Sequence, residues 1–401
     1  MKDVFIYDTL RTPRGKGTKA GALYEVKPVD LIATALRALQ VRNDLATENV
    51  TDAIIGCATP VDGQGYNIAK SGLLKAGWAD SVSGLQINRY CTSGLEAVNL
   101  AALNVGAGAA HLIVAGGVES MSQVPIGTDG GALIQDPETI NQIKYLPQGV
   151  AADLISSLEG FLRKDLDAYA EQSYERAQHA LKNGYFNKSI VPVYDRNSLP
   201  ILEYDEYLNT TTIAPSLDSF PTAFDKDGEM GYDVLAMRKY PILGEINHVH
   251  TLGNSFSAAD GAALVLLGDQ SVGHSMGWKP RAKIISFAIG SIEPTIMLTG
   301  MIPATEKALK LAGMTAKDID IWECNENFAA VVLKYHRTFD IDPAKLNVNG
   351  GAIALGHPLG ATGAILLGTI LDELERRDLN VGLVTLSGGA GMGVATIIER
   401  V

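Results

Sequence analysis

The sequence is poor in cysteine and contains no long apolar run. Only 3 cysteines occur in 401 residues, and none lies close to another. This argues against a disulfide framework or a zinc site and predicts a reducing compartment, the cytoplasm. No uninterrupted apolar stretch has the length of a transmembrane helix, and the first residues read as a strand rather than a signal segment. We therefore expect a cytoplasmic protein without membrane insertion.

Positive charge is also scarce. The chain has 33 Lys and Arg against 45 Asp and Glu, a net charge of −12. This balance argues against nonspecific binding to nucleic acid or to anionic membranes. It also opposes polyanionic ligands, so a site for one would need a local basic patch. What is present is typical of a globular protein of two or three domains, with 46% hydrophobic residues and 42 glycines.

The chain contains an imperfect internal duplication. Each half reads as a β-α-β-α-β pattern, which favours stacked α/β layers around a buried mixed sheet. Two of the cysteines, Cys57 and Cys324, fall at corresponding points of the halves, which favours structural roles for both. The first half has helix Val29–Leu45, strand Thr51–Cys57, strand Gly84–Asn88, helix Ser93–Gly106 and strand Ala110–Ala115. The second has helix Pro303–Ala312, strand Asp318–Cys324, a strand ending at Asn347, helix Pro358–Arg377 and strand Asn380–Leu386.

A polar region separates the halves, from Glu119 to about Asn247. It contains one clear amphipathic helix, Leu166–Lys182, whereas Asp195–Ser216 has no strong period. A region this long is too large for a connecting loop, so we expect an inserted subdomain that shapes a substrate cleft. A surface excursion without a ligand remains the alternative. The chain then returns to the core through a buried strand at Ala262–Leu267.

One cysteine lies where a strand turns into a helix of small residues, in Asn88-Arg89-Tyr90-Cys91-Thr92-Ser93-Gly94. Unpaired amides and the positive end of the helix dipole favour a thiolate at such a position. Because the thiolate is the reactive form, Cys91 is a candidate nucleophile. The alternative is a buried structural cysteine, the commonest fate of a lone one.

A histidine occupies a similar junction in the second half. His357 follows a glycine-rich turn and precedes Pro358, which suits the first position of a helix. A helix N-terminus pushes an imidazole toward its neutral form, as a base that takes a thiol proton requires. A hydrogen-bonded structural histidine is the alternative, and a phosphate-cradling loop is a weaker one.

Two further segments have polar or glycine-rich character. Asn325 follows a predicted strand and either holds a water or carbonyl oxygen or caps the next helix. The stretch Ser387–Gly393 either offers backbone amides to an oxyanion or forms a tight turn between strands.

Taken together, these segments resemble the thiolase family, which breaks and makes carbon–carbon bonds on coenzyme A thioesters. The resemblance covers nearly the whole chain in order and spacing, and includes Gly116–Ser122, Gly253-Asn254 and Asp260–Ala262. It implies a duplicated α/β fold, with two βαβαβ-based core domains in five α/β/α/β/α layers and an inserted loop domain. The implied domains are 1–120 plus 248–272, the loop domain 121–247, and 273–401.

The resemblance also implies roles for single residues. Cys91 becomes the acyl-accepting nucleophile and His357 the base that activates it. Asn325, through a water, would form one oxyanion hole with His357. The backbone amides of Cys91 and Gly389 would form the other. The loop domain would hold coenzyme A, with an acyl or coenzyme A pocket that includes Gln148, Asn254, Phe256 and Phe328.

Coenzyme A and acyl-CoA are implied as substrates, with no tightly bound cofactor and no metal. The resemblance further implies a homodimer or homotetramer and association with other β-oxidation enzymes. The stretches Arg11–Lys19, Tyr145–Leu154 and Ile246–His250 are closest to degradative bacterial thiolases.

Three departures from the family pattern matter. Ser387 stands where the family has a second catalytic cysteine, which moves the proton at the α-carbon of the acetyl unit. Phe256 stands where a serine is frequent, and Asn327 where an alanine is frequent. Pro147-Gln148-Gly149 also lacks the His-Met pair of the biosynthetic branch.

The leading hypothesis is an acyltransferase that cleaves 3-oxoacyl-CoA with coenzyme A, giving acetyl-CoA and a shortened acyl-CoA. Ser387 would slow this reaction or trap an intermediate. One alternative is a thiolase-like protein that binds acyl-CoA without efficient turnover. Another is an enzyme that uses Cys91 and His357 only for acyl transfer or thioester hydrolysis.

Overall fold

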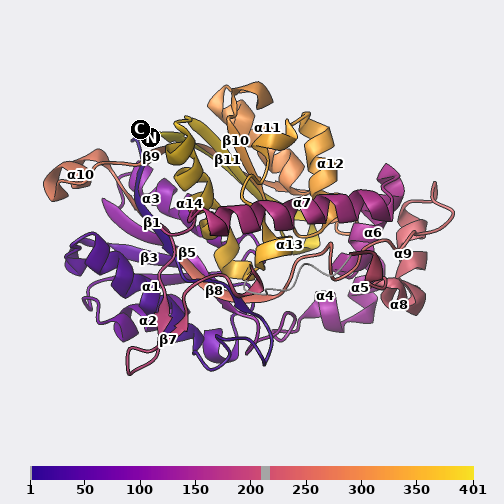
Figure 1. Ribbon diagram of the computed structural model, residues 1–401, viewed down its shortest axis with the longest axis horizontal. Helices are drawn as coiled ribbons and strands as arrows, with labels where there is room; N and C mark the ends of the chain where they lie inside the picture. The colour runs from indigo at the N-terminus through magenta and orange to yellow at the C-terminus, as the bar shows by residue number, and fades with distance from the viewer. Residues whose placement is uncertain (1, 209–216) are drawn as a thin grey trace.

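The computed structural model describes residues 2–208 and 217–401. Part of the aperiodic stretch Asp195–Ser216 therefore lies outside the described residues. The two ends of the chain lie side by side at one edge of the molecule (Figure 1). No helix in the described ranges has the length and apolar character needed to cross a membrane.

The core is one mixed sheet built from two equivalent halves. Its strand order is β10-β11-β12-β9-β1-β8-β5-β3-β4, and the short β2 (Gly15–Lys16) pairs with β8. The halves meet where β1 pairs with β9, through Phe5 with Lys283 and Ile6 with Ala282. The first half contains β1 (Phe5–Arg11), β3 (Asp52–Gly56), β4 (Ser83–Ile87), β5 (Leu112–Ser120) and β8 (Ala259–Gly268). The second contains β9 (Ala282–Ser291), β10 (Ile321–Cys324), β11 (Val381–Ser387) and β12 (Met392–Arg400).

Helices cover both faces of each half-sheet, and this confirms the expected five-layered α/β fold. The central layer consists of α3 (Ser93–Gly106) and α14 (Leu359–Arg377), which pack on each other and on strands of both halves. One outer layer is α1 (Pro28–Arg42) with α2 (Ile68–Ala76). The other is α11 (Met301–Ala312) with α12 (Ala329–Phe339). Figure 1 shows the helices of the second half above those of the first.

Glycines allow the two central helices to touch. A Cβ atom on Gly94 of α3 would lie 2.5 Å from the carbonyl oxygen of Gly360 in α14. A Cβ atom on Gly363 would lie 2.3 Å from the backbone nitrogen of Leu95. Real Cβ atoms do not approach so closely, so side chains here would push the helices apart. The contact matters because each helix begins beside a predicted catalytic residue.

The predicted strand ending at Asn347 is wrong. Its place beside β10 is taken by a single bridge between Trp322 and Leu346. A 3-10 turn at Pro343–Lys345 precedes the bridge, and Asn347 adopts a left-handed φ of 47°. The Asn347 side chain then bonds the backbone N–H and C=O of Cys324, each at 2.8 Å. In the second half, the Asn347 side chain therefore bonds the edge of β10, whereas in the first half the strand β4 pairs with β3.

The two cysteines at corresponding points do occupy equivalent strands. Cys57 directly follows β3, and Cys324 ends β10. Both are buried, and burial raises the pKa of each thiol above its ordinary range. Each side chain packs inside a hydrophobic core cluster of its own half, in keeping with structural roles.

A largely helical insertion lies between β5 and β8. The predicted helix Leu166–Lys182 is confirmed and begins three residues earlier, as α7 (Arg163–Lys182). In Figure 1, α7 crosses the molecule, and it contacts α12 and the short α13 (Ala352–Leu355), which precedes His357. The remaining elements of the insertion are α4 (Ala132–Gln135), α5 (Pro137–Ile143), α6 (Gln148–Glu159), β6 (Val193–Tyr194), β7 (Pro200–Leu202), α8 (Asp225–Asp227) and α9 (Asp233–Lys239). Helix α10 (Gln270–Met276) connects β8 to β9.

A charged histidine fastens the end of the insertion. His248 lies 2.8 Å through Nδ1 from Asp153 of α6 and 3.1 Å through Nε2 from Asp233 of α9. Because both ring nitrogens face carboxylates, both donate and the ring is an imidazolium. The Asp153 hydrogen bond, ahead of the opposing effect of burial, raises the His248 pKa to about 9.

This pKa predicts a pH-dependent stability. A histidine with a raised folded pKa stabilises fully below its unfolded pKa of about 6.5, and that contribution disappears as the pH rises through about 9. We expect His248→Gln to lower the free energy of unfolding by roughly 1–3 kcal/mol near pH 6 and by little at pH 10. Urea unfolding at both pH values measures this, with His179→Gln on the exposed side of α7 as the control. Equal losses at both pH values would contradict the ionic role.

Candidate active site

Cys91 lies in a tight turn between β4 and α3. Tyr90 adopts a left-handed φ of 50°, and the turn is held by Ser93, whose hydroxyl donates to Tyr90 O at 2.5 Å. The same hydroxyl accepts from the backbone N–H of Arg89 at 2.8 Å. Only 2% of Cys91 is exposed. The local sequence thus produces the predicted position at the start of a helix.

The expectation of a thiolate at Cys91 is wrong for the resting protein. Burial first, and the negative charge of Glu119 second, raise the pKa of the Cys91 thiol to about 12. The opposing contribution, from its own backbone N–H, is smaller. Because desolvation outweighs the helix N-terminus, the sulfur is protonated at neutral pH and needs a base to become a nucleophile.

His357 has the protonation state that such a base requires. Burial, followed by the positive charge of Arg14, lowers its pKa to about 3, so the ring is neutral. Its Nδ1 lies 2.6 Å from the Thr362 hydroxyl oxygen. That hydroxyl donates its hydrogen to Pro358 O at 3.0 Å, so it accepts from Nδ1–H and leaves a lone pair on Nε2.

This arrangement makes Thr362 a positioning residue for His357. We expect Thr362→Val to lower kcat about 10- to 100-fold with a small effect on KM. Valine keeps the shape of threonine but cannot accept the hydrogen bond that keeps the His357 proton on Nδ1. Thr362→Ser, which restores the hydroxyl, should recover most of the rate. Steady-state kinetics of the three proteins measure this, and a valine variant as active as the threonine protein would refute the role.

Cys91 and His357 lie around one small cluster of side chains. Cys91 packs with Ala58, Met121 and Leu359, and Phe256 and Ala258 pack against this group. The Phe256 ring centroid lies 5.2 Å from that of His357. Within residues 2–208 and 217–401, no hydrogen bond joins Cys91 to His357. Proton transfer between them therefore needs a side-chain movement or a bridging group.

A buried carboxylate fastens the two sides of this cluster together. Glu119, at the end of β5, accepts four hydrogen bonds of 2.8–3.1 Å, from the amides of Ala58, Thr59 and Gly360 and from the side chain of Gln64. Three donors come from the first half and one from the start of α14. No role was predicted for Glu119, although a charged residue near the end of a wholly buried, mostly apolar strand is a detectable signal.

Asn325 is brought next to His357. Its Nδ2 lies 2.8 Å from Asn327 Oδ1 and 3.3 Å from His357 Nε2. Its Oδ1 is buried and has no hydrogen-bond partner among the described residues. Helix α12 is capped at Phe328, so the alternative role of Asn325 as the helix cap is excluded. The free oxygen fits an acceptor for a bound water or ligand hydrogen.

Ser387 is buried and bound to backbone. Its hydroxyl donates to Leu298 O at 2.6 Å and accepts from the backbone N–H of Met301 at 3.3 Å. It does not line the cavity that contains Cys91, whereas Gly389, two residues later, does. The hydroxyl hydrogen is therefore committed to a carbonyl group in this state.

The cavity beside Cys91 is small, about 70 Å³. It brings together three of the predicted residues, Cys91, Gln148 and Gly389. Its other lining residues are Ala58, Thr59, Tyr90, Ile126, Gly127, Asp129, Ile134, Tyr145 and Leu359. The segment 126–134 was not predicted to reach Cys91; its glycine-rich, aperiodic sequence gives no signal for this.

The other residues predicted for the acyl or coenzyme A pocket are packed against protein. Asn254 donates to Asp167 at 2.8 Å and accepts from the backbone of Thr251 at 2.8 Å, so both ends of its amide are used. Phe328 is buried, with edge-on contacts to Phe256 and to His250, at 5.8 and 5.4 Å between centroids. Of this group, Phe256 has its ring against that of His357.

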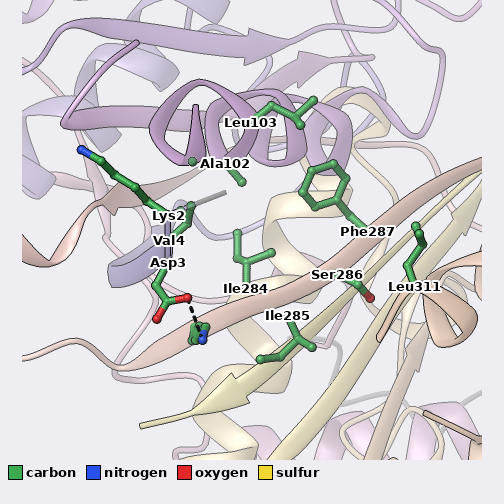
Figure 2. Close-up of a pocket in the computed structure, with 12 residues that line it drawn as sticks. Lys2, Asp3, Val4, Ala102, Leu103, Ile284, Ile285, Ser286, Phe287 and Leu311 are labelled. Atoms are coloured by element: carbon green, nitrogen blue, oxygen red, sulfur yellow. Dashed lines mark ion pairs between the residues drawn. The ribbon is translucent and has the colours of Figure 1, made fainter. Parts of the chain in front are cut away.

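A larger groove, of about 530 Å³, lies elsewhere on the molecule. Figure 2 shows it between the N-terminal residues, α3, β9 and α11, with an ion pair of 2.8 Å between Asp3 and Lys283. Aliphatic side chains such as Leu103, Ile285 and Leu311 line the rest, and the lining contains no histidine or cysteine. Size alone therefore does not identify the candidate site, because Cys91 lines the small cavity and not this groove. The described residues also contain no His, Cys, Asp and Glu group suited to a metal ion.

Comparisons with known proteins identify the family of this chain. The family model described as "Thiolase, N-terminal domain" matches residues 4–231, and "Thiolase, C-terminal domain" matches residues 278–400. A 3-ketoacyl-CoA thiolase of Bacillus subtilis (strain 168) is 37% identical, and the alignment covers 100% of both chains. An acetyl-CoA acetyltransferase of Allochromatium vinosum is 36% identical over 96% of each. The crystal structure of the Bacillus anthracis acetyl-CoA acetyltransferase aligns with a TM-score of 0.86 at 30% identity, over 100% of this chain and 99% of that one.

Proposed function

This chain belongs to the thiolase family and is an acyltransferase that catalyses the thiolase reaction, and on that basis we propose the role of each site residue. Cys91 carries the acyl group, and His357 removes the thiol proton. The substrates are a 3-oxoacyl-CoA and coenzyme A, and the products are acetyl-CoA and a shortened acyl-CoA. The observation that carries this assignment is a protonated, buried Cys91 near a neutral His357, whose Nδ1–H is held by Thr362 and whose Nε2 carries the lone pair.

In the first half-reaction, the Cys91 proton moves to His357 Nε2 and the sulfur attacks the 3-oxo carbon. The negative charge that develops on that oxygen needs hydrogen-bond donors. The amide group of Asn325 beside His357 supports one oxyanion hole there. We assign the other to the backbone amides of Cys91 and Gly389, which line the same cavity. Breaking the C2–C3 bond leaves acyl-Cys91 and the enolate of acetyl-CoA.

The enolate then needs a proton at C2, and this is the step that Ser387 endangers. A hydroxyl ionises far less readily than a thiol, and that of Ser387 is already bonded to Leu298 O. In the second half-reaction coenzyme A attacks acyl-Cys91 and needs no proton at carbon. We therefore propose slow turnover with normal formation and discharge of the acyl-enzyme.

Coenzyme A is a substrate in this scheme, with no tightly bound cofactor. We assign its binding to the loop domain, 121–247, because the insertion reaches the Cys91 cavity through Gln148 and Tyr145. From the family's properties we propose a cytoplasmic homodimer or homotetramer that works with other β-oxidation enzymes.

A direct test follows acetyl-CoA release and intact protein mass together. The protein is incubated with acetoacetyl-CoA and with a medium-chain 3-oxoacyl-CoA, each with and without coenzyme A. The proposal expects acyl-Cys91 in the absence of coenzyme A and slow acetyl-CoA release in its presence. Acyl-Cys91 without any acetyl-CoA would instead favour acyl transfer or thioester hydrolysis. Failure to modify Cys91 at all would favour a binding protein.

A further inference from the structure

Three buried side chains form a short hydrogen-bonded chain at the candidate active site. Asn325 Nδ2 lies 2.8 Å from Asn327 Oδ1 and 3.3 Å from His357 Nε2, so each of its two hydrogens faces one neighbour. At most 1% of each of the three residues is exposed. The backbone of Asn327 is fixed as well, because its carbonyl oxygen accepts from the Phe256 N–H at 3.0 Å.

The direction of this chain follows from the tautomer of His357. Thr362 accepts the hydrogen on Nδ1, so Nε2 carries a lone pair and is satisfied by a donor. The amide nitrogen of Asn325 is that donor. Two buried atoms then have no hydrogen-bond partner among the described residues, Asn325 Oδ1 and Asn327 Nδ2. One of them is an acceptor and the other is a donor.

Proton transfer to His357 reverses what the chain has to do. Once Nε2 carries the Cys91 proton, two donors face each other across 3.3 Å, which raises the energy of the imidazolium. When the Asn325 amide turns over, its oxygen faces Nε2–H, but it also faces Asn327 Oδ1, a second acceptor. Asn327 therefore has to turn as well and present Nδ2. The two atoms without partners in the resting protein are the two that the turned chain uses.

We propose that Asn327 is a positioning residue that acts through Asn325, and that the two amides turn over together when His357 receives the Cys91 proton. The resting chain donates to Nε2, and the turned chain accepts from it. The role of Asn327 is indirect, because it lets the Asn325 oxygen face a proton that the resting arrangement repels. This inference rests on the proposed function, since it requires His357 to be the base for Cys91.

A hydrogen-bonding role and a packing role for Asn327 predict opposite orders for two variants. Asn327→Leu keeps a side chain of similar shape that neither donates nor accepts. Asn327→Ala leaves room for a water molecule, which can do both and so can replace the amide. A hydrogen-bonding role therefore makes the alanine variant the faster one. A packing role makes it the slower one, because alanine leaves a cavity and leucine fills it.

Acetylation of Cys91 by acetyl-CoA isolates this step, because it moves no proton at carbon and so bypasses Ser387. The Cys91 sulfur bonds to the acetyl carbon and the bond to the sulfur of coenzyme A breaks. The thiol proton passes through His357 to the released coenzyme A. Acetyl-Cys91 is followed over time by intact mass at several concentrations of acetyl-CoA in excess. This separates the maximal rate from the half-saturating concentration.

We expect Asn327→Leu to lower the maximal rate roughly tenfold, the effect of one lost hydrogen bond, with little change in the half-saturating concentration. Asn327→Ala should recover most of that rate. Asn99→Leu is the matched control, because Asn99 is also a buried asparagine whose Oδ1 accepts a side-chain hydrogen bond, from Thr396 at 2.7 Å. It lies in the middle of α3 and bonds β12, so its variant should keep the full rate.

The outcomes separate this inference from the proposed function. Asn327→Leu at full rate, or Asn327→Ala no faster than Asn327→Leu, overturns the role of Asn327 and leaves the acyl-Cys91 assignment standing. No acetyl-Cys91 in the unmodified protein overturns the proposed function itself. Should Asn327→Leu not fold, as judged by its melting temperature, Asn327→Val takes its place with the same expectation, because valine is smaller than leucine and also neither donates nor accepts.

Discussion

Ser387→Cys is expected to raise thiolysis of a 3-oxoacyl-CoA by roughly 10²–10⁴, the usual contribution of a positioned acid or base. The gain comes from protonation of the acetyl-CoA enolate, since a thiol is a much stronger acid than a serine hydroxyl. A thiol is also a weaker donor to Leu298 O, so its proton is held less tightly. Steady-state release of acetyl-CoA measures the effect.

The pattern of the gain is as informative as its size. Acylation of Cys91 by a simple thioester should change little, because that half-reaction moves no proton at carbon. Ser286→Cys is the matched control: this buried serine also donates to a backbone carbonyl, Ala308 O at 2.8 Å, but lies on β9 outside the cavity. It should leave turnover unaltered. If Ser387→Cys gives no gain while Cys91 is acylated normally, the proton step is not limited at this position.

Cys91→Ala should abolish acyl transfer, with a loss of roughly 10⁴ or more in kcat. No other group in the cavity forms a thioester, and the remaining two cysteines are buried elsewhere. The variant should show no acyl adduct by intact mass and no burst of coenzyme A release. Its melting temperature should stay close to that of the unmodified protein, because a single small side chain is shortened.

Cys324→Ala supplies the comparison, since Cys324 Sγ packs against Met301 Sδ at 3.5 Å and does not line the cavity. It should retain the acyl adduct. An adduct that survives in Cys91→Ala but disappears in Cys324→Ala would transfer the nucleophile role to Cys324.

Local patterns predicted much of this molecule. The helix Ser93–Gly106 was predicted with the bounds that the structure has, because a run of small and apolar residues follows a turn. The same reasoning placed Cys91 and His357 at the starts of the two central helices. These features depend on neighbouring residues, which a sequence displays directly.

What the sequence hid depends on distant contacts. The thiol of Cys91 was expected to ionise because its helix is visible, whereas the burial and the Glu119 carboxylate that raise its pKa come from folding. The strand predicted to end at Asn347 is absent because the Asn347 side chain bonds the backbone of Cys324, a contact that the sequence does not display. The contact between Gln148 and the Cys91 cavity likewise joins segments nearly sixty residues apart.

The tie made by Glu119 has a consequence for the history of the duplication. The helices α3 and α14 are equivalent elements of the two halves, yet one begins beside a nucleophile and the other beside a base. Glu119 hydrogen-bonds both to the first half and to the start of α14, so Cys91 and His357 are brought together only where the two halves meet. Neither half expressed alone should form an acyl-enzyme, whereas the two co-expressed as separate chains should. Loss of either half would therefore remove one member of the pair.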